Sequence, residues 1–204
     1  MLLMVIKLLN LKYTNFHFPC RPSAMLRTFL FLIFSFCAFN LYASEGIWLL
    51  VDTNALKIEV KRGEQTVDII EGIAIGQAGA GHKAHRGDNI TPYGEYRIGW
   101  VGERSTFRKF FGLNYPSVQD ADNALRKGII NRYTYNDIIS AHAYNHVPPQ
   151  NTPLGGRIGI HGLGAASEKI HRTMNWTHGC IALTNNQIDH LSQWVDTGTL
   201  VKIK

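Results

Sequence analysis

The feature that most constrains the fold is a series of short apolar runs separated by turn residues. Residues 47–51, 56–60 and 67–70 each have the length of a strand, and residues 56–60 alternate between apolar and charged side chains. Polar and glycine-containing segments at 52–54 and 62–64 interrupt these runs. Strands of this length joined by short turns are typical of a β-meander. The sequence therefore predicts neighbouring antiparallel strands at the start of this region.

The rest of the chain continues this pattern and adds a few helices. Further strands are expected at 91–100, 157–162, 181–183 and 199–203. Helices are expected at 120–127 and 134–144, and a third is capped by Thr184 or Asn185 and carries Ile188, Leu191, Trp194 and Val195 on one face. Residues 105–156 have helical features, end in a Pro- and Gly-rich loop and are expected to frame or cover a cleft. The fold expected is mainly β, with two or three helices.

The N-terminal segment has the pattern of a secretory signal. Residues 1–43 contain four basic and no acidic residues, and Met25 is a candidate start codon followed closely by Arg27. The apolar run at 29–39 is shorter than the roughly 20 residues of a membrane-spanning helix, and Ala43 offers a small residue for cleavage. We therefore expect a leader at 1–43, one folded domain at 44–204 and export to the periplasm or cell envelope. Contact with the membrane is expected only through the leader, if it is not cleaved.

The charge balance argues against a nucleic-acid partner. The formal charge of the chain is +6, but without the leader 17 basic and 15 acidic residues remain. A domain with a net charge of +2 lacks the excess of basic residues that phosphate backbones require. The glycines at 76–81 do not open an apolar helix, so a dinucleotide loop is not expected either.

A single cysteine in the body of the chain indicates a reactive thiol. Cys20 and Cys37 lie in the leader, which leaves Cys180 without an intramolecular partner. Cys180 follows His178 and Gly179, and glycine allows a sharp turn on which successive N–H groups can point toward an oxyanion. A thiol also needs a base to ionise near neutral pH, and His161 lies on a predicted strand 19 residues upstream. These residues predict a cysteine nucleophile activated by a histidine.

At these residues the sequence resembles the L,D-transpeptidase catalytic domain, the YkuD family. The family pattern is a histidine, about fifteen residues, and then Ser/Thr-His-Gly-Cys, which corresponds here to His161 and to Thr177, His178, Gly179 and Cys180. The Ile-His-Gly sequence at 160–162 and the Thr-Pro-x-Gly-Glu-Tyr sequence at 91–96 also match. The resemblance covers roughly residues 47–204.

The resemblance implies a sandwich-like β domain with a helical insertion and assigns roles to several residues. Cys180 is the implied nucleophile and His161 the general base and acid, oriented by the Gly162 carbonyl. Backbone N–H groups of His178, Gly179 and Cys180 are the implied oxyanion hole. The substrate is a peptidoglycan stem peptide, cut between the L-centre of diaminopimelate and the terminal D-Ala. The acceptor is an amine of a second stem or of a wall-linked lipoprotein, and neither a metal nor an organic cofactor is expected.

Several residues around this motif are candidates for binding substrate. Arg157, like Arg86, Lys169 and Arg172, is a candidate for holding carboxylates, because arginine pairs with them through two parallel hydrogen bonds. Trp176, Thr177 and Tyr93 are candidates for lining the cleft. His142 and His146 have a spacing found at metal sites, but Ala143 breaks the HExxH pattern, so a metal is not expected.

One departure from the family pattern leaves the reaction open. Many members carry Arg or Asn two positions after the cysteine, where this chain has Ala182, and Asn185 is a candidate for supplying a polar contact instead. A carboxypeptidase or amidase that hydrolyses the same stems, and a wall-binding module without turnover, stay as alternatives. A redox thiol protein is disfavoured, because the body of the chain has no second cysteine.

Overall fold

A computed structural model describes residues 46–204, apart from the side chains of Arg104 and Ser105. The leader expected at residues 1–43, with its candidate start at Met25, lies outside the described residues.

Short strands make up most of the regular structure. The strands are β1 (Ile47–Asp52), β2 (Lys57–Arg62), β3 (Gln65–Glu71), β4 (Ala80–Gly81), β5 (Thr91–Pro92), β6 (Gly94–Ser105), β7 (Arg108–Leu113), β8 (Gly159–His161), β9 (Ile181–Ala182) and β10 (Leu200–Ile203). The helices are α2 (Val118–Arg126), α3 (Arg132–Ala143), α4 (Glu168–Thr173) and α5 (Asn185–Leu191). The predicted mainly β fold is thereby confirmed.

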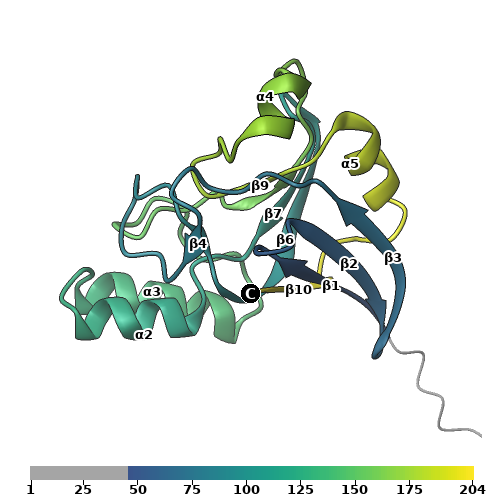
Figure 1. Ribbon diagram of the computed structural model, residues 1–204. Helices are drawn as coiled ribbons and strands as arrows, with labels where there is room; N and C mark the ends of the chain where they lie inside the picture. The colour runs from purple at the N-terminus through teal and green to yellow at the C-terminus, as the bar shows by residue number, and fades with distance from the viewer. Residues whose placement is uncertain (1–45) are drawn as a thin grey trace, which may run out of the picture. The chain divides into compact units, whose positions relative to one another are not determined.

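Eight of these strands form one sheet in the order β3-β2-β1-β10-β6-β7-β8-β9, and β4 pairs with β5. The predicted meander is present, since β1, β2 and β3 pair antiparallel in sequence order. The C-terminal strand β10 inserts beside β1 in parallel and thereby joins the meander to β6. At the far end β8 and β9 are also parallel, and α4 lies near this end of the molecule (Figure 1).

The chain after β3 crosses to the opposite end of the sheet and pairs with β9. Ala74 and Ala182 exchange two backbone hydrogen bonds of 3.0 and 2.7 Å. Two residues on, Gly76 forms a bridge with Thr177. The sheet therefore folds over on itself, and its two halves enclose the core.

The core is built from inward-facing aliphatic side chains of both halves. In β1 and β2 the buried and partly exposed residues alternate, as expected for strands with one face toward the interior. Tyr96 and Tyr115 are the largest side chains that are almost completely buried. Residues that are completely inaccessible include Leu49, Val51, Ile58, Val60, Ile160, Ile181, Leu183, Ile188 and Val201.

Three differences from the sequence-based expectation bear on the site. β7 falls inside the region 105–156, where we expected helices at 120–127 and 134–144 but no strand. Its residues at 111–113 are all buried and show no alternation. α4 was not expected, because six residues are too few for a recognisable helical period. Trp194 and Val195, expected on the last helix, follow its end at Leu191.

The helical insertion consists of α2 and α3, which lie side by side at one flank of the sheet (Figure 1). Ser117 and Asp120 form a capping box at the start of α2, and Asn131 caps α3 through the backbone N–H of Thr134. None of the helices within residues 46–204 is both long and apolar enough to cross a membrane.

Candidate active site

The segment from Thr177 to Cys180 forms a sharp turn just before β9. The Thr177 hydroxyl donates to the Cys180 carbonyl at 2.6 Å and accepts the Gly179 N–H at 3.1 Å, so it braces the turn from inside. Gly179 has a φ of +125°, and a Cβ there would lie 2.7 Å from the Ile90 carbonyl oxygen. Only glycine fits this position, because it tolerates positive φ and leaves room for the neighbouring backbone.

The Cys180 thiol lies between this turn and the backbone that leads into β8. Its Sγ donates to the Arg157 carbonyl at 3.5 Å, and the residue is partly exposed. Desolvation by the surrounding protein raises the pKa of the thiol to about 11, although the Gly159 backbone and the charge of Lys83 act to lower it. The resting side chain is therefore a neutral thiol at neutral pH.

His161 is buried at the end of β8, with 3% of its surface exposed. Its Nδ1 lies 2.7 Å from the Gly162 carbonyl oxygen. Because a carbonyl only accepts, Nδ1 carries the proton, and Nε2 of the neutral ring is an acceptor. Burial lowers the pKa of His161, and the bond to Gly162 opposes this in part. The imidazole is therefore neutral at neutral pH, and its Nε2 can accept a proton.

Cys180 and His161 come from neighbouring segments at one end of the sheet. Ile160 pairs with Ile181 and His161 with Ala182 in the parallel ladder, and Cys180 immediately precedes the first of these pairs. The thiol is thus carried by the turn that leads into β9, and the imidazole by the last residue of the adjacent strand β8.

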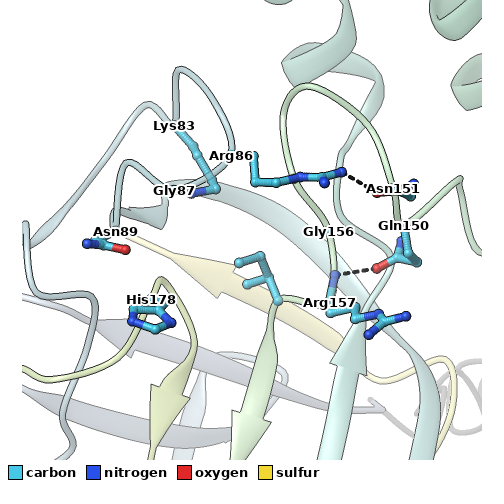
Figure 2. Close-up of a pocket in the computed structure, with 11 residues that line it drawn as sticks. Lys83, Arg86, Gly87, Asn89, Gln150, Asn151, Gly156, Arg157 and His178 are labelled. Carbon is cyan, nitrogen blue, oxygen red and sulfur yellow. Dashed lines mark hydrogen bonds between the residues drawn. The ribbon is translucent and has the colours of Figure 1, made fainter.

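A pocket of about 840 Å³ opens beside this turn (Figure 2). Of the eleven residues that line it, three are cationic and none is acidic; the cations are Lys83, Arg86 and Arg157. His178 lines the pocket from the Cys180 turn, and Gln150 and Asn151 line it from the loop that follows α3. Such a surface suits a ligand with carboxylates.

The two loops that wall this pocket are tied to each other. The Arg86 guanidinium donates to the Asn151 side chain and to the Thr152 carbonyl, the latter at 2.9 Å. Arg157 has a φ of +55°, which is uncommon for a residue with a side chain, and its N–H donates to Gln150 Oε1 at 2.6 Å. This backbone conformation positions the Arg157 carbonyl that accepts a hydrogen bond from the Cys180 thiol. Figure 2 shows the hydrogen bond between Arg157 and Gln150.

The other residues that the sequence suggested for substrate binding lie in different surroundings. Trp176 contacts the site, since its ring meets His161 edge-on at a centroid distance of 6.0 Å. Thr177 is buried and acts within the turn rather than at the pocket. Tyr93 lies between β5 and β6, packs on the core and is not among the lining residues. Arg172 pairs with Glu168 on α4 at 2.9 Å.

Other contacts at the site carried no recognisable sequence signal. Phe107 lies 4.4 Å from the His161 ring between centroids, and Phe110 stacks on the same ring at 6.1 Å. Asn185, which the sequence marked only as a possible polar contact, bonds both the N–H and the carbonyl of Gly164 at 2.8 Å. It thereby fixes the turn that follows His161 and Gly162.

Metal-ligand geometry is not present in the described part of the chain. Among residues 46–204, no group of three or more His, Cys, Asp or Glu side chains is arranged to hold a metal ion. His142 instead contacts the Pro116 carbonyl at 2.8 Å, and His146 lies beyond the end of α3.

Comparison with known families decides the classification of this arrangement. A family model for the L,D-transpeptidase catalytic domain, YkuD, matches residues 46–203. The chain belongs to this family. Its members are L,D-transpeptidases, so the resemblance based on the His161 and Cys180 motifs is confirmed at the level of the family.

Two solved structures have a similar fold at low sequence identity. Pgp2 from Campylobacter jejuni, described as a helical cell shape determining protein, is 22% identical, with a TM-score of 0.54; the match covers 80% of this chain and 49% of that one. Bd1075 from Bdellovibrio bacteriovorus is 19% identical, with a TM-score of 0.51, and the match covers 81% and 50%. The chain thus spans about half the length of these proteins. No curated protein matches it.

Proposed function

We propose that this chain is an exported cysteine acyltransferase that acts on peptidoglycan stem peptides. The observation that carries the proposal is that Cys180 and His161 come from adjoining segments, since Cys180 immediately precedes β9 and His161 ends the neighbouring parallel strand β8. Membership of the L,D-transpeptidase family supports the reaction class. The site of action is the periplasm or cell envelope, reached through the N-terminal leader.

The first half of the reaction is formation of a thioester. Nε2 of His161 takes the thiol proton as Sγ of Cys180 attacks the carbonyl carbon at the L-centre of diaminopimelate. The tetrahedral intermediate then expels the amine of D-Ala, which receives the proton from the imidazolium. Because burial favours the neutral forms of both groups, proton transfer is expected to accompany the attack on the substrate.

The negative charge on the tetrahedral intermediate needs hydrogen-bond donors at the turn. The proposed donors are backbone N–H groups of His178, Gly179 and Cys180. The Gly179 N–H is engaged by the Thr177 hydroxyl in this conformation, which leaves the N–H groups of His178 and Cys180 as the nearer candidates. The His178 side chain is exposed and lines the pocket, where it is proposed to contact substrate.

The cationic pocket is proposed to hold the carboxylates of the stem peptide. Arg157 and Arg86 can pair with a carboxylate through two parallel hydrogen bonds. Trp176, which lies against His161, is proposed to floor the reaction site. Thr177 is buried, which supports a role in shaping the turn rather than in binding substrate. Tyr93 does not line the pocket, so its position gives no support to a substrate contact.

In the second half of the reaction an acceptor resolves the thioester. An amine of a second stem, or of a wall-linked lipoprotein, would give a cross-link, whereas water would give a trimmed stem. The hydrolytic alternative stays in place because Ala182 occupies the position of the polar residue in many family members, and it is buried in β9. Either outcome would remodel the wall and is expected to influence cell shape.

Two measurements on the purified chain test this proposal. Intact-mass spectrometry after incubation with a carbapenem should show a covalent adduct, which peptide mapping should assign to Cys180. Incubation with a disaccharide-tetrapeptide should then release D-Ala. Cross-linked dimers would identify transfer, and free D-Ala with tripeptide alone would identify hydrolysis.

Matched variants separate the proposed roles. Cys180→Ala should form neither adduct nor product, and His161→Gln should react much more slowly in both measurements. His142→Gln, a change of the same kind outside the site, should behave like the wild type. If the wild-type thiol is titratable and yet gives neither adduct nor product, the chain is a binding module and the proposal is wrong.

A further inference from the structure

A buried lysine on the loop that contacts the Cys180 turn was not among the site residues that the sequence indicated. Lys83 is on the loop between β4 and β5, and 2% of its side-chain surface is exposed. Its ammonium is paired with Asp88, whose side chain is 7% exposed. The same Lys83 side chain lines the cationic pocket together with Arg157 and His178 (Figure 2).

The Lys83 loop is packed directly against the Cys180 turn. The Asp88 carboxylate accepts the Ile90 N–H at 3.1 Å, and the Ile90 carbonyl is the group that approaches Gly179 most closely. Asp88 also accepts the N–H groups of Ala84 and His85 at 2.8 and 3.2 Å. This network holds the ammonium in a fixed place within the loop that contacts Gly179, the residue before Cys180.

Stability alone is a weak explanation for this pair. Burying two charges costs desolvation free energy that their attraction often fails to offset, and an apolar pair of similar size is frequently as stable. Loop geometry does not require the lysine either, because Asp88 already accepts three backbone N–H groups. A buried cation next to a thiol that must become an anion has a more direct electrostatic use.

We propose that Lys83 is a positioning residue whose fixed positive charge stabilises the Cys180 thiolate and the oxyanion that forms beside it. The part concerning the thiolate stands whether or not the chain is a transpeptidase, and the part concerning the oxyanion rests on the proposed function. The proposed stabilisation of the thiolate agrees with the electrostatics of the resting site, where the Lys83 charge acts to lower the pKa of Cys180 against the effect of burial.

The other charged and titratable groups around the thiol are distributed differently. His161 is on β8, Arg157 precedes β8 and is exposed, His178 is on the turn itself, and Arg86 is tied to the opposite loop. Solvent screens an exposed cation far more than a buried one. Lys83 is therefore the cation with the strongest expected effect on the sulfur.

The test is the pH dependence of Cys180 alkylation by iodoacetamide in the full chain. The tryptic peptide of residues 173–202 contains Cys180 and neither Cys20 nor Cys37, so mass spectrometry follows this thiol alone. Lys83→Met should lower the alkylation rate at pH 7 by roughly tenfold, which corresponds to one pKa unit. Lys83→Arg should retain most of the wild-type rate.

Asp88→Asn separates charge from structure. It breaks the same ion pair but leaves the ammonium, so its alkylation rate should equal or exceed that of the wild type. If Asp88→Asn lowers the rate as much as Lys83→Met does, the pair only holds the loop and the proposal is wrong. An unchanged rate in Lys83→Met would overturn it as well.

The measurement also distinguishes unfolding from the proposed effect. In an unfolded chain the pKa of a cysteine thiol returns to about 8.5, so unfolding raises the alkylation rate at pH 7, opposite to the expected change. Alkylation of the thiol by iodoacetamide does not require the chain to catalyse any reaction. A lowered rate in Lys83→Met together with absent D-Ala release would therefore support the thiolate effect while contradicting the proposed function.

Discussion

The carbonyl oxygen of Gly162 lies 2.7 Å from Nδ1 of His161, the residue that precedes it in the chain. This contact fixes the imidazole tautomer through the backbone and leaves Nε2 as the acceptor. A carboxylate is not required as the third member of the site. The orientation of the imidazole depends instead on the shape of the turn at 162–164, which Asn185 holds from α5.

The first prediction concerns the two hydrogen bonds by which Asn185 holds Gly164, called here the Asn185 clamp. Asn185→Ala removes both hydrogen bonds to Gly164 and should lower kcat by roughly 10- to 100-fold, because small displacements of a base are costly to catalysis. KM should change little. The exposed neighbour Asn186→Ala is the control, and steady-state kinetics of D-Ala release is the measurement. Equal kcat values in the two variants would show that the clamp does not position His161.

The second prediction concerns the braced turn. Thr177→Val preserves the shape of the side chain but removes the hydroxyl that bonds Gly179 and Cys180. Leaving these buried backbone groups unpaired should cost about 2 kcal/mol of unfolding free energy and most of the activity. Thr177→Ser keeps the hydroxyl and should retain activity. Urea denaturation and the carbapenem-adduct rate measure the two effects, and a Ser variant as impaired as the Val variant would argue against the brace.

The third prediction concerns Phe107, whose ring packs on the His161 imidazole. The Phe107 ring is 38% exposed and contacts the imidazole, whose pKa is lowered mainly by burial. Phe107→Ala should admit water and move the pKa of His161 upward toward its ordinary value. An NMR titration of the imidazole would detect this, with Ile69→Ala, another partly exposed apolar residue, as control. A downward movement of the pKa would contradict the assigned cause.

The fourth prediction concerns stability at acid pH. Burial is the main cause that lowers the pKa values of both His161 and His171 in the folded protein. The unfolded chain then binds more protons, so stability is fully present above about pH 6.5 and is lost as the pH falls from there through the lower folded-state pKa values. The urea midpoint should therefore fall below pH 6.5.

His171→Phe isolates one of these contributions. It removes the ionisable group from α4 while keeping a ring of similar size, so the urea midpoint should fall less between pH 7 and pH 5 than in the wild type. His85→Phe, at an exposed position, should leave the wild-type pH dependence unchanged. An equal fall in the His171 variant and the wild type would show that this histidine is not held neutral by the fold.

The elements near the site were predictable to the extent that local residues determine them. The strands at 47–51 and 199–203 follow from apolar runs, and the cap of α5 at Thr184 follows from its hydroxyl and from Gln187 three residues later. β7 was missed because both of its faces are covered, which removes the alternation that reveals a half-exposed strand.

For the candidate site, the sequence indicated the chemistry but not its surroundings. Cys180 and His161 stood out because residue type and spacing carry chemical meaning without knowledge of the fold. The contacts of Phe107 and Lys83 depend on pairing between segments far apart in the chain, so no local pattern reports them. Tyr93 shows the converse, since a family-like segment placed it near the cleft while the core contacts of its ring hold it elsewhere.

The reciprocal bonds between Ala74 and Ala182 have a consequence for handling the protein in solution. The strand that follows Cys180 is only two residues long and would otherwise end the sheet with unpaired backbone groups, a common starting point for aggregation. Because the segment after β3 occupies that position, the reactive end of the molecule offers no template to another chain. The Cys180 thiol therefore lies beside a sheet edge whose backbone groups are paired within the chain, which disfavours association of two copies through this edge.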